Sequence, residues 1–191
     1  VYGYDISGRV FDLDYRGEVS LSNGLTSPML NYDTLAADSK DGEWIPRVSV
    51  GFTKSFDYGE VQDRINVTNE FYYNQAGYDK NIFQRLADNG DANLKATYLT
   101  DYYQAYQNSK YYWGLFSSVG KFIVPEMTLS CNSIMNLVDK SATVSAGISY
   151  VPALTDMEFD FTINGALGGE NTEATFMGSR LSVNLGTRIS F

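Results

Sequence analysis

The final twelve residues, RLSVNLGTRISF at 180–191, alternate between polar and apolar side chains up to the last position. A β-strand points successive side chains to opposite faces, so this pattern predicts a strand with one apolar and one polar face. Strands of soluble proteins usually have ~5–6 residues, whereas a strand that crosses a bilayer at a tilt needs about 9–11. The segment is long enough to cross a bilayer, and a long edge strand in a soluble sandwich is the alternative.

Eight earlier segments show the same long alternation: 9–22, 46–57, 60–74, 94–107, 110–124, 127–138, 141–151 and 157–167. Together with 177–191 they predict nine strands. Closed bacterial single-chain barrels almost always have an even number. Residues 1–7 or 25–32 are therefore candidates for a tenth strand, and the chain can equally be the carboxyl-terminal part of a larger barrel. Both faces of 110–124 are apolar, which predicts a bulge there or contact with something that fills the interior.

Composition supports an all-β fold without a membrane-spanning helix. The 191 residues suffice for one domain, and 15 Tyr, 11 Phe and 17 Gly favour strands and tight turns. No run of 18 apolar residues occurs, and a closed barrel is the only other structure that spans a bilayer. The mean hydropathy of -0.25 is compatible with a barrel, in which only alternate residues are apolar. We expect one domain over 1–191, an antiparallel up-and-down transmembrane β-barrel of about 10 strands.

Residues 47–70 predict a hairpin with a two-residue turn at Tyr58-Gly59. Such a turn fixes the register of both strands. The opposed pairs are then Arg47 with Glu70, Thr53 with Arg64, Val50 with Val67 and Lys54 with Asp63. Two of these pairs join opposite charges across the strands, which is a favourable arrangement.

A second predicted hairpin has its turn at Asp139-Lys140 and places Met135 opposite Val144. It puts Cys131 on the apolar face, where we expect a small buried hydrophobe with an inert thiol. Because Cys131 is the only cysteine in the chain, it can form no internal disulfide.

The polar faces of the predicted strands carry charges of both signs. Six are acidic and five are basic, so the set is nearly neutral: Asp12, Asp14, Glu18, Glu70, Glu158, Asp160, Arg16, Arg47, Arg64, Arg180 and Arg188. In a barrel these side chains would face a wet lumen. The same-face pairs Asp12 with Asp14 and Glu158 with Asp160 could in principle hold a cation, but neutralisation by facing arginines is the favoured interpretation.

The chain has no histidine, which removes the commonest general base and most transition-metal sites. No set of nucleophile and base is recognisable, so we expect no enzyme activity, no cofactor and no metal. The net charge of -9 argues against a nucleic-acid partner, since phosphate binding needs clustered Lys and Arg. The sequence begins at Val1 without a signal peptide, which fits a processed mature protein or a piece of a longer one.

The terminal strand closes on Phe191, with Leu185, Thr187 and Ile189 at every second place before it. This pattern resembles the β-signal of Gram-negative bacterial outer-membrane β-barrel proteins. The resemblance implies a location in the outer membrane, export through the periplasm and a terminal Phe at the periplasmic rim. It also implies two partners, the lipid bilayer and the barrel-assembly machinery that reads the terminal strand.

The predicted strand count conflicts with this class in one respect. If Phe191 is periplasmic, the tight turns at 58–59, 108–109 and 139–140 lie outside, and the long connections 23–45 and 75–93 lie inside. The class has short periplasmic turns and long outer loops, so either one strand is miscounted or the periplasmic side is elaborated. Residues 79–90 predict a short helix with Asp79 as its cap and Gly90 at its end, although an ordered loop is the simpler interpretation.

Three functions fit these observations. The first is a porin-like channel or transport component with a mixed-charge lumen, which needs a wide barrel because ~8–10 strands leave an interior that side chains fill. The second is a structural or interaction barrel, filled by salt bridges, that binds another cell-envelope protein. The third is a soluble ligand-binding β-barrel. Aromatic residues near the predicted strand ends favour a membrane, where such rings gather at the interfaces: Tyr2, Tyr4, Tyr15, Tyr58, Trp113, Tyr111 and Tyr150.

Overall fold

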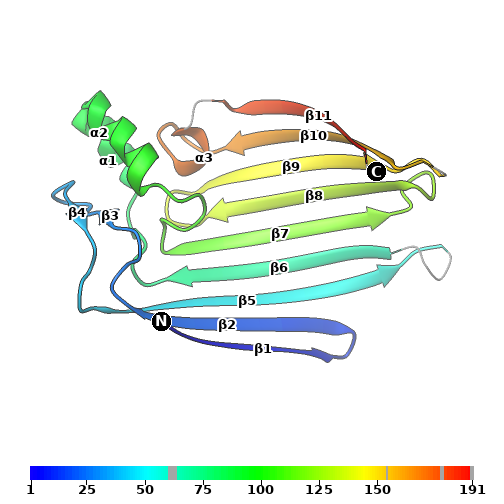
Figure 1. The fold of residues 1–191 in the computed structure, drawn as a ribbon, viewed down its shortest axis with the longest axis horizontal. Helices are drawn as coiled ribbons and strands as arrows, with labels where there is room; N and C mark the ends of the chain where they lie inside the picture. The colour runs from blue at the N-terminus through cyan, green and yellow to red at the C-terminus, as the bar shows by residue number, and fades with distance from the viewer. Residues whose placement is uncertain (60–63, 154, 177–178, 190–191) are drawn as a thin grey trace.

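One large antiparallel β-sheet dominates the computed structural model, which describes residues 1–59, 64–153, 155–176 and 179–189 (Figure 1). Within these residues the sheet has nine strands in the order β1-β2-β5-β6-β7-β8-β9-β10-β11. The strands are β1 (Tyr2–Val10), β2 (Leu13–Asn23), β5 (Trp44–Asp57), β6 (Arg64–Asn74), β7 (Tyr111–Gly120), β8 (Met127–Asn136), β9 (Ser141–Tyr150), β10 (Met157–Leu167) and β11 (Leu181–Ile189). The predicted all-β, up-and-down antiparallel fold is thereby confirmed.

The other elements lie in the connections at one end of the sheet (Figure 1). They are a small two-stranded sheet and four helical segments: β3 (Met29–Leu30), β4 (Ala37–Asp38), α1 (Ile82–Asn89), α2 (Ala92–Thr97), a π-helix (Tyr98–Tyr102) and α3 (Glu173–Phe176). Among the described residues, no helix has the length and apolar character needed to cross a membrane.

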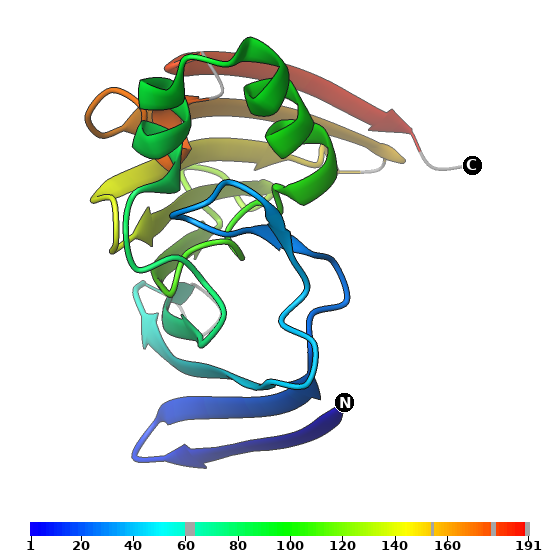
Figure 2. The same cartoon turned by 90° about the vertical axis from the view of Figure 1, so that its left-hand side faces the viewer.

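The large sheet curves across its strands into a trough, with β1 and β11 as its two edges (Figure 2). This curvature follows from the right-handed twist that strands impose on their neighbours. Within the part of the chain that the structure describes, β1 and β11 do not pair with each other. The sheet is therefore an open trough.

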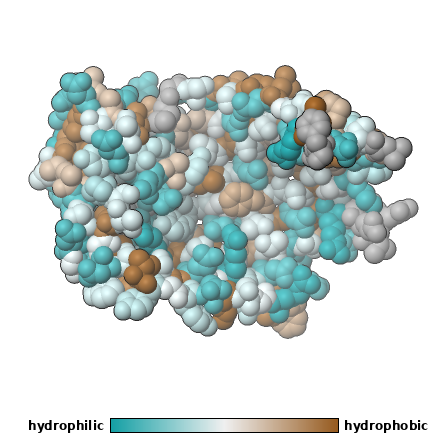
Figure 3. All heavy atoms as spheres, viewed as in Figure 1, coloured by the Kyte–Doolittle hydropathy of each residue, from teal (hydrophilic) through white to brown (hydrophobic). Residues whose placement is uncertain are grey.

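The strand register gives the trough an apolar convex face and a polar concave face. On the convex face Val50 lies opposite Phe71, and Phe161 lies between Ile148 and Leu185. The view into the trough is mostly of hydrophilic and intermediate residues (Figure 3). Because successive side chains alternate between the two faces, most strands separate their apolar from their polar residues, and β7 is an exception with Tyr112 and Phe116 on the concave face.

The buried hydrophobic core lies at the end of the sheet and not on its convex face. It is built mainly from the long connections, and its residues are Met29, Leu30, Ile45, Ala76, Tyr78, Ile82, Phe83, Leu86, Tyr98 and Phe176. On the convex face, Leu185 is 82% exposed and Phe161 is 38% exposed. Nothing in the described chain covers the apolar side of the sheet.

A short helix was one of two interpretations of 79–90, and the structure has this helix, α1, in place of the ordered loop that was the simpler interpretation. Its cap is Asn81 rather than Asp79, because the Asn81 side chain accepts a hydrogen bond from the Gln84 N–H at 3.1 Å. Gly90 ends the helix in the left-handed conformation, with φ of 74°. The helix buries one apolar side in the core at the end of the sheet.

The predicted strand 94–107 is wrong, because this segment forms α2 and the π-helix. Its apolar residues Leu94, Tyr98 and Tyr102 recur every fourth position, a spacing that places them on one side of a helix. The Asp91 side chain caps α2 by accepting bonds from the N–H groups of Asn93 and Leu94. The helical spacing and the cap outweigh the alternation.

The predicted strand 9–22 is also wrong at its start, because the chain turns at Phe11 and Asp12. Both residues have positive φ, 48° and 61°, as in the tight turns that join two antiparallel strands. Residues 2–7 of the candidate segment 1–7 belong to β1, which supplies the extra strand. The other candidate, 25–32, contributes only the two residues of β3.

Both predicted hairpin registers are wrong by an even number of residues. In the first hairpin Arg47 lies opposite Asn74 rather than Glu70, because β5 runs to Asp57 and β6 begins at Arg64. Residues 60–63, where part of the expected strand falls, lie outside the described chain. In the second hairpin Met135 lies opposite Ala142. An even shift keeps every side chain on its predicted face, so the assignment of faces survives both errors.

The two ends of the sheet differ in the length of their connections. The connections 11–12, 58–63, 121–126 and 151–156 share the end at which β11 finishes. The connections 24–43, 75–110 and 168–180 lie at the opposite end, together with 137–140. The conflict expected from the sequence came from the miscounted strand 94–107. Without that strand, most of the short connections share the end at which β11 finishes, and 137–140 is the short connection at the other end.

Candidate functional site

The concave face of the trough collects most of the charged residues expected to share one surface. Nine of the eleven occupy its strands: Asp14, Arg16, Glu18, Arg47, Arg64, Glu70, Glu158, Asp160 and Arg188. Asp12 is a correction, because it lies in the turn between β1 and β2. Arg180 is a second correction, since it immediately precedes β11.

Arginine–carboxylate pairs neutralise part of this surface. Arg9 contacts both carboxylate oxygens of Asp14, at 2.6 and 2.8 Å. Arg16 donates to Glu70 Oε2 at 2.5 Å, in place of the expected pairing of Glu70 with Arg47. Arg188 donates to Glu158 Oε2 at 2.9 Å. The carboxylates Asp14 and Glu158, considered above as cation ligands, thus have cationic partners within the chain.

Three adjacent strands form an uncharged band in the middle of the concave face. β7, β8 and β9 contain no Asp, Glu, Lys or Arg, whereas the concave faces of β2, β5, β6, β10 and β11 do. We call the concave face of these three strands the neutral lane. Its side chains are Tyr112, Phe116, Ser118, Thr128, Ser130, Asn132, Ile134, Asn136, Ser141, Thr143, Ser145 and Ser149.

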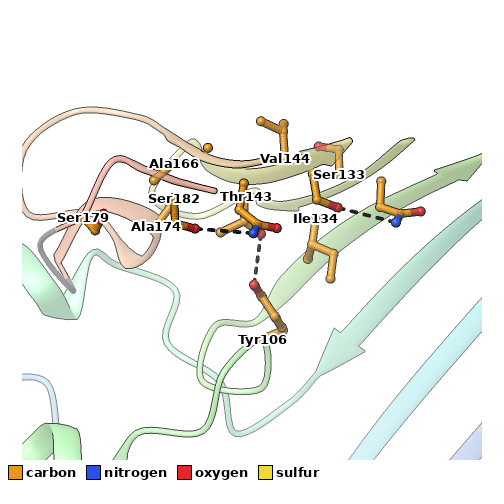
Figure 4. A pocket seen from close by; sticks show the side chains of 13 residues that line it. Tyr106, Ser133, Ile134, Thr143, Val144, Ala166, Ala174, Ser179 and Ser182 are labelled. Carbon is orange, nitrogen blue, oxygen red and sulfur yellow. Dashed lines mark hydrogen bonds between the residues drawn. The ribbon is translucent and has the colours of Figure 1, made fainter. Parts of the chain in front are cut away.

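The connection before β7 folds back onto the neutral lane. Tyr106 reaches across to β9, where its hydroxyl is 3.0 Å from Thr143 Oγ1 (Figure 4). Its ring meets that of Tyr112 edge-on, with 6.4 Å between centroids. The two apolar faces expected for 110–124 are explained in this way: Tyr112, on the concave face of β7, packs against the chain's own connection.

Glu173 anchors this connection, and sequence reasoning missed it. The residue is buried, with 4% of its surface exposed. The hydroxyl of Tyr112 and the amide of Asn136 donate to Oε2 at 2.9 and 2.8 Å. The hydroxyl of Tyr103 and the N–H of Tyr106 donate to Oε1, both at 3.2 Å. One carboxylate thus ties α3, the connection before β7 and the ends of two strands together.

Burial raises the pKa of the Glu173 carboxyl above its ordinary value. Desolvation is the largest cause, and the hydrogen bonds from Tyr112 and Asn136 oppose it by stabilising the charged form. The nearby charge of Asp139 raises the pKa further. No local sequence signal distinguishes Glu173 from Glu170, three residues before it. The four hydrogen-bond donors reach Glu173 only through the fold.

Among the cavities of the concave face, two differ clearly in chemistry. One of about 310 Å³ lies beside Tyr106, between the neutral lane, β10 and the start of β11 (Figure 4). The other, of about 510 Å³, lies over β1, β2, β5 and β6 and is lined by Asp5, Glu18 and Arg47 among others. The first cavity is uncharged and the second carries both signs of charge.

The remaining expected residues lie on the convex face or near strand ends. Leu185, Thr187 and Ile189 lie on the convex face of β11, whereas Phe191 falls outside the described residues. Cys131 lies on the convex face opposite Ala146, and it is exposed rather than buried. The aromatic residues noted in the sequence lie at or near the ends of strands: Tyr2, Tyr4, Tyr15, Tyr58, Trp113, Tyr111 and Tyr150.

Comparison of the chain with protein-family models, with curated proteins and with solved structures found no match in any of the three.

Proposed function

We propose that this chain forms the wall of a bacterial outer-membrane β-barrel, with lipid against its convex face and a water-filled, porin-like lumen along its concave face. One observation carries the proposal. No layer of the described chain packs on the apolar side of the sheet, while the buried core lies at one end. An apolar surface of this extent is unfavourable in water but matches the hydrocarbon of a bilayer.

Strand length and aromatic placement support the same proposal. The strands of the large sheet have 9 to 14 residues, enough to cross a bilayer at a tilt. The ring centroids of Tyr2 and Trp44 are 6.2 Å apart at one end of the sheet. At the same end, the ring centroids of Tyr73 and Tyr111 are 5.5 Å apart. Aromatic rings at this level suit the interface between lipid and water.

The unequal ends of the sheet support an orientation. Outer-membrane barrels have short periplasmic turns and long extracellular loops. Here most of the short connections share the end at which β11 finishes, where the resemblance to a β-signal would place the periplasmic rim. The helices and the connection that enters the trough would then lie at the extracellular mouth.

The direction of the strands limits how such a barrel could close. Each strand reverses the one before it, so β1 and β11 run in the same direction. An antiparallel closure therefore needs an odd number of additional strands between these two edges, which gives an even total. A barrel widened in this way has room for an aqueous lumen.

A structural or interaction barrel is the second candidate, and the connection at 103–109 favours it. This connection lies over the neutral lane and narrows the trough. Single-channel recordings in planar bilayers separate the two candidates. We expect steady openings for the channel, and a barrel that folds without conductance would favour the interaction role.

Contact with lipid can be tested at two adjacent residues of β11. In a background of Trp44→Phe and Trp113→Phe, Leu185→Trp places a fluorophore on the convex face and Asn184→Trp places one on the concave face. In vesicles with brominated acyl chains, we expect strong quenching at position 185 and weak quenching at 184. Equal quenching at both positions, or protein that stays soluble without detergent, would contradict the proposal.

A further inference from the structure

We propose that the uncharged cavity beside Tyr106 binds a neutral carbohydrate of one or two sugar units. The proposal rests on the proposed function, because the ligand would reach the cavity through the water-filled lumen. It adds a substrate class to that function. The cavity of about 310 Å³ lies between the neutral lane, β10, the start of β11 and the connection that bends into the trough (Figure 4). That volume is at the low end of the ~300–1,000 Å³ typical of small-molecule sites.

The walls of this cavity supply hydrogen bonds without charge. None of its lining residues is Asp, Glu, Lys or Arg. The polar lining residues that carry the argument are Asn132, Asn164, Thr143, Ser145 and Ser182. Each amide or hydroxyl can both donate and accept, and this is the pattern that a sugar hydroxyl presents in return.

The two asparagine amides on the cavity wall make long contacts within the protein. The amide of Asn132 is 3.4 Å from Ser145 Oγ, and the amide of Asn164 is 3.4 Å from Ser182 Oγ. Both distances exceed the usual 2.7–3.2 Å range for an N–H donor and an oxygen acceptor. The two amides can therefore donate hydrogen bonds to a ligand while giving up only weak hydrogen bonds within the protein.

Tyr106 is held at the cavity wall in an unfavourable backbone conformation. Its φ is +61°, a value that glycine or asparagine adopts more readily than tyrosine. Buried Glu173 accepts the Tyr106 N–H at 3.2 Å, and the phenol pairs with Thr143 at 3.0 Å. Strain of this kind gathers at functional sites, and the ring provides an apolar surface against which the C–H face of a sugar can pack.

The charge pattern of the trough favours a neutral ligand over an ionic one. A charged ligand in the uncharged cavity would lose hydration without gaining a counter-charge. The cavity of about 510 Å³ over β1, β2, β5 and β6 contains Asp5, Glu18 and Arg47, and it is the better match for an ion. We therefore expect neutral sugars to bind in the uncharged cavity and ionic solutes in the cavity of mixed charge.

The proposal can be tested by titrating purified protein with glucose and maltose in a sugar-free zwitterionic detergent. Calorimetry and saturation-transfer NMR report binding, and gluconate serves as the charged comparator. We expect saturable binding of at least one neutral sugar and at least tenfold weaker binding of gluconate. Asn164→Ala and Tyr106→Gly should each weaken sugar binding by tenfold or more.

Asn184→Ala is the matched control, because Asn184 lies on the concave face of β11 outside the cavity. It should bind sugar like the unmodified protein. Absence of saturable binding, equal loss in Asn184→Ala, or gluconate binding as tight as that of sugar would overturn the proposal. Conductance is recorded separately, so a conducting barrel without sugar binding contradicts this inference alone. If Tyr106→Gly fails to fold, Asn164→Ala still decides the outcome.

Discussion

Glu173 shows how one buried carboxylate can organise a set of connections. Burying a charge is costly unless hydrogen bonds replace its hydration. Here two tyrosine hydroxyls, one amide and one backbone N–H do so. These donors come from two parts of the chain, 103–112 and Asn136, and both are remote from Glu173 in the sequence. The position of the connection over the trough therefore depends on a residue that belongs to none of the strands of the sheet.

Removing the Glu173 carboxylate should release the connection at 103–109. Glu173→Ala leaves Tyr103, Tyr112 and Asn136 without their acceptor, at a cost of about 1–3 kcal/mol for each buried group left unpaired. We expect faster proteolysis at Lys110 and, if the chain forms a channel, larger conductance. Glu170→Ala is the control, because Glu170 is an exposed residue of the connection 168–180 that also contains Glu173. This variant should leave both the proteolysis and the conductance unchanged.

The raised pKa of Glu173 predicts that the stability of the folded protein depends on pH. Its carboxyl binds a proton more tightly in the folded than in the unfolded state, so the folded state is relatively more stable at low pH. The advantage should shrink as pH rises from the ordinary Glu value of 4.5 through the raised folded value. Melting temperatures of the native protein should therefore fall relative to Glu173→Gln over that window. A constant difference across the window would contradict a perturbed Glu173.

At the scale of elements, alternation predicted eight of the nine strands of the sheet at least in part, and its failures have physical causes. Alternation at 94–107 coexists with apolar residues at every fourth position, and the alternation alone does not decide between strand and helix. The turn at Phe11 and Asp12 lacks the Asn-Gly or Asp-Gly pair that marks such turns, so the sequence appears continuous there. Glu173 depends on contacts across the fold, which no local pattern predicts.

The register of the β5–β6 hairpin can be measured with cysteine pairs in a Cys131→Ser background. Thr53 and Thr68 lie directly opposite each other, and their hydroxyls are 2.8 Å apart. Thr53→Cys with Thr68→Cys should therefore form a disulfide on mild oxidation. Thr53→Cys with Arg64→Cys tests the register expected from the sequence, and these positions lie about 13 Å apart along the strands. A disulfide in the second pair only would show that the β5–β6 register described above is wrong.

At the scale of the whole molecule, the sheet separates two environments that a soluble protein would arrange differently. A soluble sheet packs its apolar face against a second layer, whereas this sheet packs no layer of the described chain there. The polar face instead carries paired charges and a folded-in connection. From β1 to β11 the convex face is mainly apolar and the concave face mainly polar, with Tyr112, Phe116 and Ile134 as apolar residues of the neutral lane, so this separation extends across the entire sheet.

This separation predicts unequal costs for the same charged residue on the two sides of one strand. Leu115 lies near the middle of β7 on the convex face, and Ser118 lies on its concave face. Leu115→Arg should reduce the free energy of unfolding in lipid vesicles by about 2–4 kcal/mol, which is the cost of arginine at the bilayer midplane. Ser118→Arg should cost much less, because that side chain reaches water. Denaturant titration in vesicles measures both, and a larger cost at Ser118 would mean that the concave face, not the convex face, contacts the hydrocarbon.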